Sequence, residues 1–283
     1  MQTRRQFLVT TSAVTAGSLL LPSFTNKYKK ITNAGVQLYT FRKEMLDDAK
    51  GTLQKIAALG IKQIESAASI KGHYYGLSAK EMKEVCTNLG MTLRSGHVQI
   101  NDKWEQTMNE AAEAGQEYLV CSVMPTHGQT ADNYKKVAEV FNKAGEACKK
   151  LNIKFGYHNH GEEFEMDKDE ILYDILLKNT DAGLVHMEMD LGWVVVAGKN
   201  PLDYFEKYPG RFPLWHLKDM KISKKISTEF GKGDLDIVQI LKNKKQAGLQ
   251  YYFIEQEEYS HSAFESMEIN MEYLKKQKIQ SQL

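Results

Sequence analysis

Helical stretches and short apolar runs alternate along most of the chain. One unit begins with residues 53–59, whose apolar positions have a helical period, stops at Gly60, and continues into an extended apolar run at 61–65. Ser78 and Glu81 have the spacing of a helix capping box. The same pattern predicts strands at 36–41, 61–65, 91–97, 118–123, 155–160, 183–190, 212–218 and 251–255 and helices at 53–59, 79–89, 104–114, 133–151, 171–177, 201–208, 237–247 and 262–276.

This regular alternation predicts an α/β fold, with a parallel sheet covered by helices. Eight such units in the roughly 255 residues that follow a leader are typical of a (β/α)8 TIM barrel. We therefore predict one TIM-barrel domain over residues 33–283. A doubly wound sheet is the competing architecture. It usually carries a Gly-rich phosphate loop after its first strand, and residues 42–46 contain no such loop.

Residues 1–30 have the composition of an export signal. Two adjacent arginines, Arg4 and Arg5, precede a mostly small and apolar stretch at 9–21 that is too short to span a bilayer. The arginines and the Phe-Leu pair after them resemble a twin-arginine signal, which implies export of the folded protein. We expect a periplasmic or otherwise exported protein, free of the membrane after cleavage within residues 16–30.

Composition narrows the classes of partner. The 283-residue chain has a hydrophobic fraction of 42%, so a sizeable core can form. Its formal net charge of +1 gives no basic face for nucleic acid. Cys86, Cys121 and Cys148 lack CxxC spacing, so we expect small buried residues rather than a zinc cluster or a disulfide framework.

Several predicted strands end in residue types that bind metal ions or transfer protons. In a TIM barrel, the carboxyl ends of the strands meet at one face and supply the active site. Asp190, His216 and Glu255 form an oxygen-rich set with one imidazole, which suits Mn²⁺, Co²⁺ or Mg²⁺, and Zn²⁺ is also compatible. A divalent cation held there would polarise a substrate carbonyl. The strand-end residues are Glu65, His97, His158, His160, Asp190, His216, Lys218 and Glu255.

Four short motifs follow one another in the second half of the chain. They are His-Asn-His at 158–160, Met-Asp-Leu-Gly-Trp at 189–193, Trp-His-Leu-Lys-Asp at 215–219 and Ile-Glu-Gln-Glu at 254–257. In this order they resemble the xylose isomerase-like TIM-barrel superfamily, and more narrowly its sugar phosphate isomerase/epimerase group, over residues 35–283. The resemblance implies a divalent metal held by a Glu, an Asp, a His and a second Glu from strands five to eight.

Three of these ligands carry over by motif, namely Asp190, His216 and Glu255. The first Glu has no counterpart, because its usual place in the strand-five motif falls near Gly156. His158 faces the same way two residues later, since side chains alternate along a strand. We therefore predict His158 as the fourth metal ligand, with His160 as the next choice.

Lys218 shares strand parity with His216 and should therefore face the site. A nearby cation and partial burial would lower the pKa of this lysine and make it a base. The alternative is a lysine that bridges two carboxylates at the barrel mouth. Proton transfer is assigned to Glu255, His158 or Lys218. Substrate contacts are expected from Glu65, His97, His160 and Trp193, with Tyr39, Phe41 and Trp104 as further aromatic candidates and Glu188 and Glu257 as supporting carboxylates.

The expected reaction is abstraction of the proton next to a carbonyl of a sugar or keto-sugar, giving isomerisation or epimerisation through an enediolate. A lyase or dehydratase acting on a 3-keto-glycoside or an inosose is an alternative, because the His-Asn-His strand resembles the inosose dehydratase branch. A non-catalytic sugar-binding barrel is the alternative of another class, since strand five lacks its Glu. We expect an unphosphorylated small-molecule substrate and no nucleic-acid partner; a homo-oligomer is compatible with the sequence.

Overall fold

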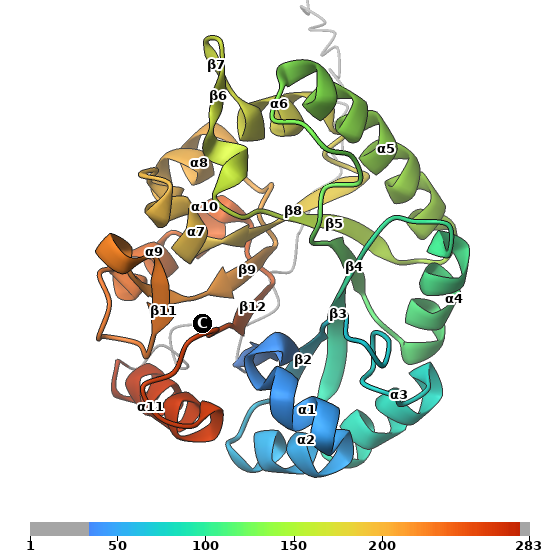
Figure 1. Ribbon diagram of the computed structural model, residues 1–283, viewed down its shortest axis with the longest axis vertical. Helices are drawn as coiled ribbons and strands as arrows, with labels where there is room; N and C mark the ends of the chain where they lie inside the picture. The colour runs from blue at the N-terminus through green and yellow to red at the C-terminus, as the bar shows by residue number, and fades with distance from the viewer. Residues whose placement is uncertain (1–33, 278–283) are drawn as a thin grey trace, which may run out of the picture.

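A computed structural model describes residues 34–277 as a closed barrel of parallel strands surrounded by helices, which confirms the predicted TIM barrel (Figure 1). The predicted leader at residues 1–30 lies outside the described residues. The barrel strands are β1 (Gly35–Gln37), β2 (Gln63–Ser66), β3 (Thr92–Val98), β4 (Tyr118–Cys121), β5 (Lys154–His158), β8 (Val185–Asp190), β9 (Leu214–Leu217) and β12 (Tyr251–Ile254). They hydrogen-bond in the ring order β1-β12-β9-β8-β5-β4-β3-β2, so β12 pairs with both β1 and β9.

The helices form the outer layer in Figure 1. Their bounds are α1 (Arg42–Asp47), α2 (Ala49–Ala58), α3 (Ala79–Asn88), α4 (Trp104–Ala114), α5 (Ala131–Lys150), α6 (Leu172–Asn179), α7 (Leu191–Val196), α8 (Pro201–Lys207), α9 (Ile237–Lys242), α10 (Lys244–Ala247) and α11 (Ala263–Lys276). The capping box predicted at Ser78 and Glu81 is present at the start of α3. Within residues 34–277, no helix has both the length and the apolar composition needed to cross a membrane.

Apolar side chains form two cores. The larger one lies between the strands and the helices, and the smaller one consists of Tyr118, Val120, Leu214, Tyr251 and Phe253. Because side chains on one strand face repeat every second residue, the small core continues into polar residues at the mouth. Leu214 is followed on its face by His216, and Phe253 by Glu255. The strands thus place charged groups at the mouth of the barrel, above the small apolar core.

The structure differs from the predicted elements in several places, and it contains two short helices, α1 and α7, that were not predicted. The first strand ends at Gln37, and the 3-10 helix η1 (Leu38–Phe41) follows, because the Gln37 side chain accepts a hydrogen bond from the Tyr39 N–H at 3.1 Å. The helix predicted at 237–247 is divided into α9 and α10 at Asn243. Two hairpins were not predicted: β6 (Met166–Asp167) with β7 (Glu170–Ile171), and β10 (Asp219–Lys221) with β11 (Ile226–Thr228).

Asp219 fixes the polar loop after β9. Its carboxylate accepts hydrogen bonds from the N–H groups of Gly231, Gly233 and Leu235 at 2.8, 3.1 and 3.2 Å. A side chain at Gly233 has no room, because a Cβ there would lie 2.1 Å from Asp219 Oδ1. The loop is therefore anchored next to the mouth of the barrel.

Candidate active site

The four residues predicted to hold a metal ion meet at the mouth of the barrel. They lie at the ends of β5, β8, β9 and β12, which are consecutive in the ring, and each offers a donor atom within 4.8 Å of the others. His216 Nδ1 lies 3.0 Å from His158 Nε2 and 3.0 Å from Glu255 Oε2. His158 Nε2 lies 3.5 Å from Asp190 Oδ2. We refer to His158, Asp190, His216 and Glu255 as the mouth cluster.

Asp190 uses its two carboxylate oxygens differently. Oδ1 accepts a 3.0 Å hydrogen bond from the Trp193 N–H and so caps α7 at its N-terminus. Oδ2 faces the mouth cluster, where His158 Nε2 is 3.5 Å away. It lies 2.9 Å from the Lys218 ammonium. The cap therefore orients the carboxylate and leaves one oxygen available to a ligand.

The donor chemistry of the mouth cluster fits a divalent cation. Zn²⁺ ligands lie about 2.0–2.2 Å from the ion, so neighbouring donors are roughly 3–3.5 Å apart, and the separations of 3.0, 3.0 and 3.5 Å agree. Burial, reinforced by His216, holds the pKa of His158 well below its ordinary value. His158 is therefore neutral, as a metal ligand must be. Two imidazoles beside two carboxylates favour Mn²⁺, Co²⁺ or Zn²⁺ over Mg²⁺.

Lys218 bridges three carboxylates. Its Nζ lies 2.9 Å from Asp190 Oδ2, 2.7 Å from Glu255 Oε2 and 2.7 Å from Glu257 Oε1. Burial disfavours the charged lysine, but these carboxylates outweigh burial and hold the pKa of Lys218 well above its ordinary value. The bridging alternative therefore describes this residue, and the lowered pKa expected beside a bound cation stays a prediction. Lys218 as a carrier of the substrate proton stays a prediction, and the ammonium can only donate.

Glu255 remains ionised in this setting. Burial disfavours its charge, yet Lys218 and His216 hold the pKa of Glu255 well below its ordinary value. The residue is 6% exposed and lines the pocket above the cluster. An ionised carboxylate at the pocket floor is a base within reach of a bound molecule.

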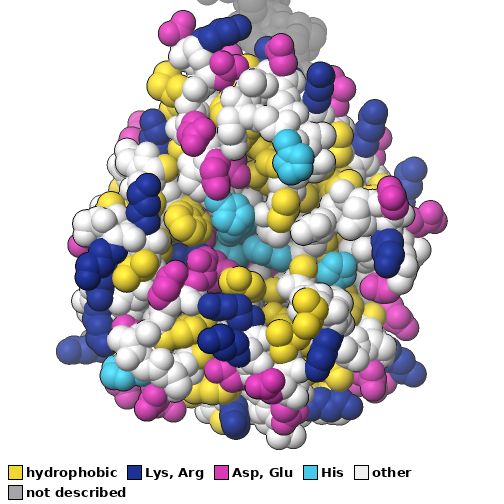
Figure 2. Space-filling view, viewed as in Figure 1, with side chains coloured by type: hydrophobic (Ala, Val, Ile, Leu, Met, Phe, Trp, Pro, Cys, Tyr) yellow, Lys and Arg dark blue, Asp and Glu magenta, His cyan; other side chains and the backbone are white. Residues whose placement is uncertain are grey.

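A pocket of about 320 Å³ opens above the mouth cluster. Figure 2 shows histidine side chains gathered at the bottom of the hollow in the centre of this face. Three residues predicted to contact substrate, His97, His160 and Trp193, lie on its wall. The lining also includes Tyr39, Ala67, Ala68, Gln99, Ser122, Val123, His158, Glu255 and Glu257.

Glu65 lies beneath the pocket and not on its wall. It is fully buried, and its Oε1 lies 2.7 Å from His216 Nε2 and accepts a 2.8 Å hydrogen bond from the Gln37 side-chain amide. This contact orients the His216 ring so that Nδ1 points to the mouth cluster. Burial raises the pKa of Glu65, but its electrostatic interaction with His97 and the contacts with His216 outweigh burial and lower the pKa to about 2. A direct contact of Glu65 with substrate stays a prediction.

The remaining candidates divide between the pocket and the core. Tyr39 lines the pocket, whereas Phe41 is buried in the core and Trp104 packs edge-on against Phe155. Sequence reasoning missed the two polar lining residues Gln99 and Ser122, which follow the ends of β3 and β4. Their place just after a strand was the available signal, but many polar loop residues share it.

Comparison with known proteins gives relatives of the same architecture. The profile of the xylose isomerase-like TIM barrel family matches residues 53–277. A crystal structure described as a sugar phosphate isomerase/epimerase from Parabacteroides distasonis is 28% identical, with a TM-score of 0.76, and covers 86% of this chain and 93% of its own. A second such structure from that organism is 29% identical, with a TM-score of 0.77, and covers 86% of this chain and 97% of its own.

One curated relative is named as a dehydratase, an enzyme of the lyase class. The inosose dehydratase of Clostridium tetani is 33% identical over 121 residues, which make up 43% of this chain. The matched part spans 36% of that protein's length. The profile match includes every strand of the barrel except β1. The chain belongs to the xylose isomerase-like TIM barrel family.

Proposed function

We propose that the protein is a divalent-metal-dependent enzyme that removes the proton next to a carbonyl of a keto-sugar or keto-polyol. The observation that carries this proposal is the convergence of two imidazoles and two carboxylates at the floor of the mouth pocket. A bound divalent cation would polarise the carbonyl and stabilise the negative charge that forms when the proton leaves. Isomerisation or epimerisation of the sugar is the outcome we propose first.

Glu255 is the proposed base. Its carboxylate is ionised and lines the pocket, so it can accept the proton from a substrate carbon held over the floor. Lys218 stays charged when Glu255 becomes neutral, because Asp190 and Glu257 remain within 2.9 Å and 2.7 Å of its ammonium. Lys218 therefore keeps Glu255 ionised before the proton transfer. After the transfer, its ammonium still pairs with Asp190 and Glu257.

Return of the proton to a different position requires a second group. His158 and His160 line the pocket together with Glu255, and their rings lie 4.9 Å apart. We assign the return step to His160, because an imidazole outside the mouth cluster can both accept and donate a proton. Proton return to the opposite face of the same carbon gives an epimer, and return to the neighbouring carbon gives an isomer.

Elimination is the second candidate, and the similarity to inosose dehydratases favours it. In this reaction the proton next to the carbonyl is removed in the same way, but a hydroxyl or alkoxyl group then leaves from the β carbon. At the end of β5, His158 stands in place of the strand-five carboxylate. His160, an imidazole on the pocket wall outside the mouth cluster, would protonate that leaving group.

We further propose export of the protein and a substrate without phosphate. The sequence of residues 1–30 supports export. None of the described residues that line the pocket is Lys or Arg, the side chains that usually pair with a phosphate. An unphosphorylated keto-sugar or its glycoside therefore suits the pocket better than a sugar phosphate.

The test is hydrogen exchange in D₂O, followed by NMR, on a panel of unphosphorylated keto-sugars, 3-keto-glycosides and inososes. Wild-type protein loaded with Mn²⁺ or Co²⁺ should introduce deuterium next to the carbonyl, and Glu255→Gln should slow this exchange by about 100-fold or more. Glu229→Gln changes a buried carboxylate held by Ser260 and Ser266 away from the pocket and is the matched control. An epimer or isomer supports the first candidate, and loss of water or of an alcohol supports the second.

Absence of exchange would contradict both candidates. If metal-loaded protein bound a panel sugar tightly but neither exchanged its protons nor converted it, a sugar-binding barrel without catalysis would be the better description.

A further inference from the structure

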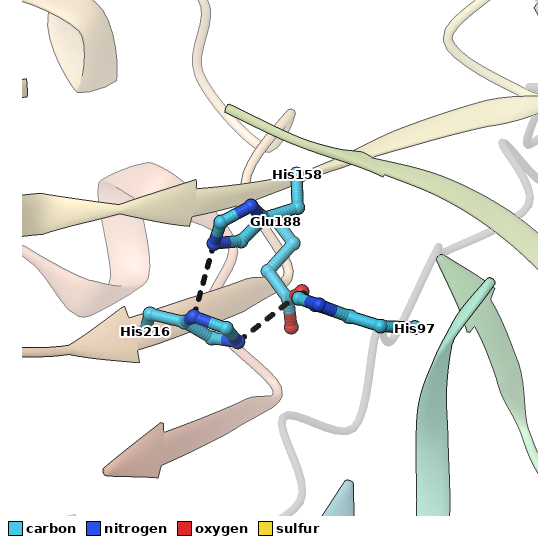
Figure 3. A group of neighbouring side chains, drawn as sticks. All are labelled: His97, His158, Glu188 and His216. Carbon is cyan, nitrogen blue, oxygen red and sulfur yellow. Dashed lines mark hydrogen bonds and ion pairs between the residues drawn. The ribbon is translucent and has the colours of Figure 1, made fainter. Parts of the chain in front are cut away.

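A second group of buried polar side chains lies deeper in the lumen than the mouth cluster. It consists of Glu65 on β2, His97 on β3 and Glu188 on β8, together with the Nε2 side of His216. Figure 3 shows the His216 ring between His158 on one side and Glu188 and His97 on the other. We refer to Glu65, His97, Glu188 and His216 as the inner cluster.

The inner cluster has the spacing of a metal site. His97 Nε2 lies 2.7 Å from Glu188 Oε2 and 3.4 Å from Glu65 Oε1. His216 Nε2 lies 2.7 Å from Glu65 Oε1 and 3.4 Å from Glu188 Oε2. Two nitrogens and two oxygens therefore alternate around one point. The two separations of 3.4 Å match the roughly 3–3.5 Å expected between ligands of one ion, and the two of 2.7 Å are hydrogen bonds that a bound ion would replace.

Unpartnered oxygens support the presence of a ligand. Glu65 and Glu188 are both 0% exposed. Within residues 34–277, Glu65 Oε2 and Glu188 Oε1 have no hydrogen-bond donor except the opposite carboxyl group, and that hydrogen bond requires a proton on one of the two residues. A buried carboxylate oxygen without a partner is costly, and coordination of a cation would remove that cost.

We propose that the inner cluster binds a second divalent cation, held by His97 and His216 through their Nε2 atoms and by the carboxylates of Glu65 and Glu188. When both cations are bound, His216 coordinates one through Nδ1 and the other through Nε2. A neutral imidazole has one lone pair, so the second cation displaces the remaining ring N–H proton, which is released to solvent. The inner cation would lie beneath the mouth cluster, on the other side of the His216 ring.

The test is metal stoichiometry of the full-length protein. Metal-free protein is saturated with Zn²⁺ or Mn²⁺, freed of excess ion on a desalting column, and measured by elemental analysis. Wild type should retain two ions per chain, Glu188→Gln one, and Asp190→Asn one. Glu229→Gln, the buried carboxylate outside both clusters, should retain two. Crystals of the wild type should show two anomalous peaks, one on each side of the His216 ring.

Each outcome separates this inference from the proposed function. One ion per chain in the wild type, unchanged by Glu188→Gln, would show that Glu65 and Glu188 share a proton instead, and the second site would be refuted while the mouth site stands. Loss of both ions in Glu188→Gln would also refute two separable sites. Wild type without any bound ion would remove the basis of the proposed function as well. The wild-type count needs no variant, so poor folding of a mutant does not obscure the result.

Discussion

A single carboxylate can serve the fold and the chemistry when its two oxygens face different neighbours. Asp190 caps α7 with Oδ1 and presents Oδ2 to the mouth cluster. Asparagine retains the capping oxygen but not the charge, whereas alanine retains neither. The two replacements therefore separate the structural contribution of this residue from its contribution to metal binding.

We expect Asp190→Asn and Asp190→Ala to lose the same amount of metal affinity. Asp190→Ala should lose more stability than Asp190→Asn. Both should bind the ion at the mouth cluster more than about 100-fold more weakly, since even residues that only support ligands contribute roughly 10–100-fold. In the presence of a chelator, Asp190→Ala should be less stable than Asp190→Asn by about 1 kcal/mol, the usual contribution of an N-cap. Urea unfolding and metal titration measure the two effects. Equal stability of the variants would contradict the capping role.

At this scale the sequence predicted which residues assemble but not their charge states. Asp190, His216, Glu255 and His158 end strands, and strand ends meet at the mouth of any such barrel. The protonation of Lys218 depends on three carboxylates from β8 and from the segment after β12, and no local pattern brings these together. The depth of Glu65 was missed for the same reason, because it follows from the tilt of strands around the lumen.

At the scale of elements, α7 sits directly against the buried lysine. Gly192 lies in its first turn, and a Cβ added there would be 2.7 Å from Met220 Cγ and 3.0 Å from Lys218 Cδ. The missing side chain therefore makes room for the stem of Lys218, whose ammonium also lies 5.5 Å from the Trp193 ring. The helix and the lysine are positioned together.

Gly192→Ala should destabilise the protein by about 1–3 kcal/mol, the usual cost of an added group in a tight interior. It should also weaken metal binding, because a displaced Lys218 ammonium would no longer hold the carboxylates of Asp190 and Glu255 in place. Gly161→Ala is the control on the same face, where the nearest atom to the new Cβ, Trp193 Cε3, is 3.9 Å away. Denaturant unfolding compares the two, and equal effects would argue against close packing at position 192.

The order and type of the barrel elements followed from sequence, whereas irregular elements did not. Repeated helical and extended periods predicted all eight barrel strands, since each unit buries one apolar face on its neighbours. The hairpin of β10 and β11 depends on contacts outside its own segment, including the Glu258 carboxylate, which accepts a 2.8 Å hydrogen bond from the Ser227 N–H. Such a contact joins residues far apart in the sequence, so no periodic pattern of apolar residues predicts it.

The whole barrel should lose stability on mild acidification, in part through His186. This residue lies near the amino end of β8 and contacts the Tyr118 ring edge-on at 5.8 Å. Burial, with smaller effects of Lys154 and Arg211, lowers its pKa to about 4. In the unfolded chain this histidine has a pKa of about 6.5, so it binds a proton at a pH where the folded protein keeps it neutral. The free energy of unfolding therefore falls as pH decreases from about 6.5 to about 4.

In metal-free protein, His186→Gln should reduce this loss of stability by up to about 3 kcal/mol over that pH range. Urea unfolding at half-unit pH intervals measures the slope. His261→Gln removes an exposed histidine and is the control for loss of an imidazole at the surface. A slope as steep in His186→Gln as in the wild type would show that other groups account for the acid sensitivity.

The strand that closes the ring also brings the last ligand. β12 docks between β1 and β9, and Glu255 follows it directly, while the other members of the mouth cluster lie earlier in the chain. During synthesis, the growing chain therefore lacks a complete coordination shell until its final repeat has emerged and the ring has closed. Uptake of the proposed ion would therefore mark completion of the molecule, and immature chains would not hold it with the same affinity.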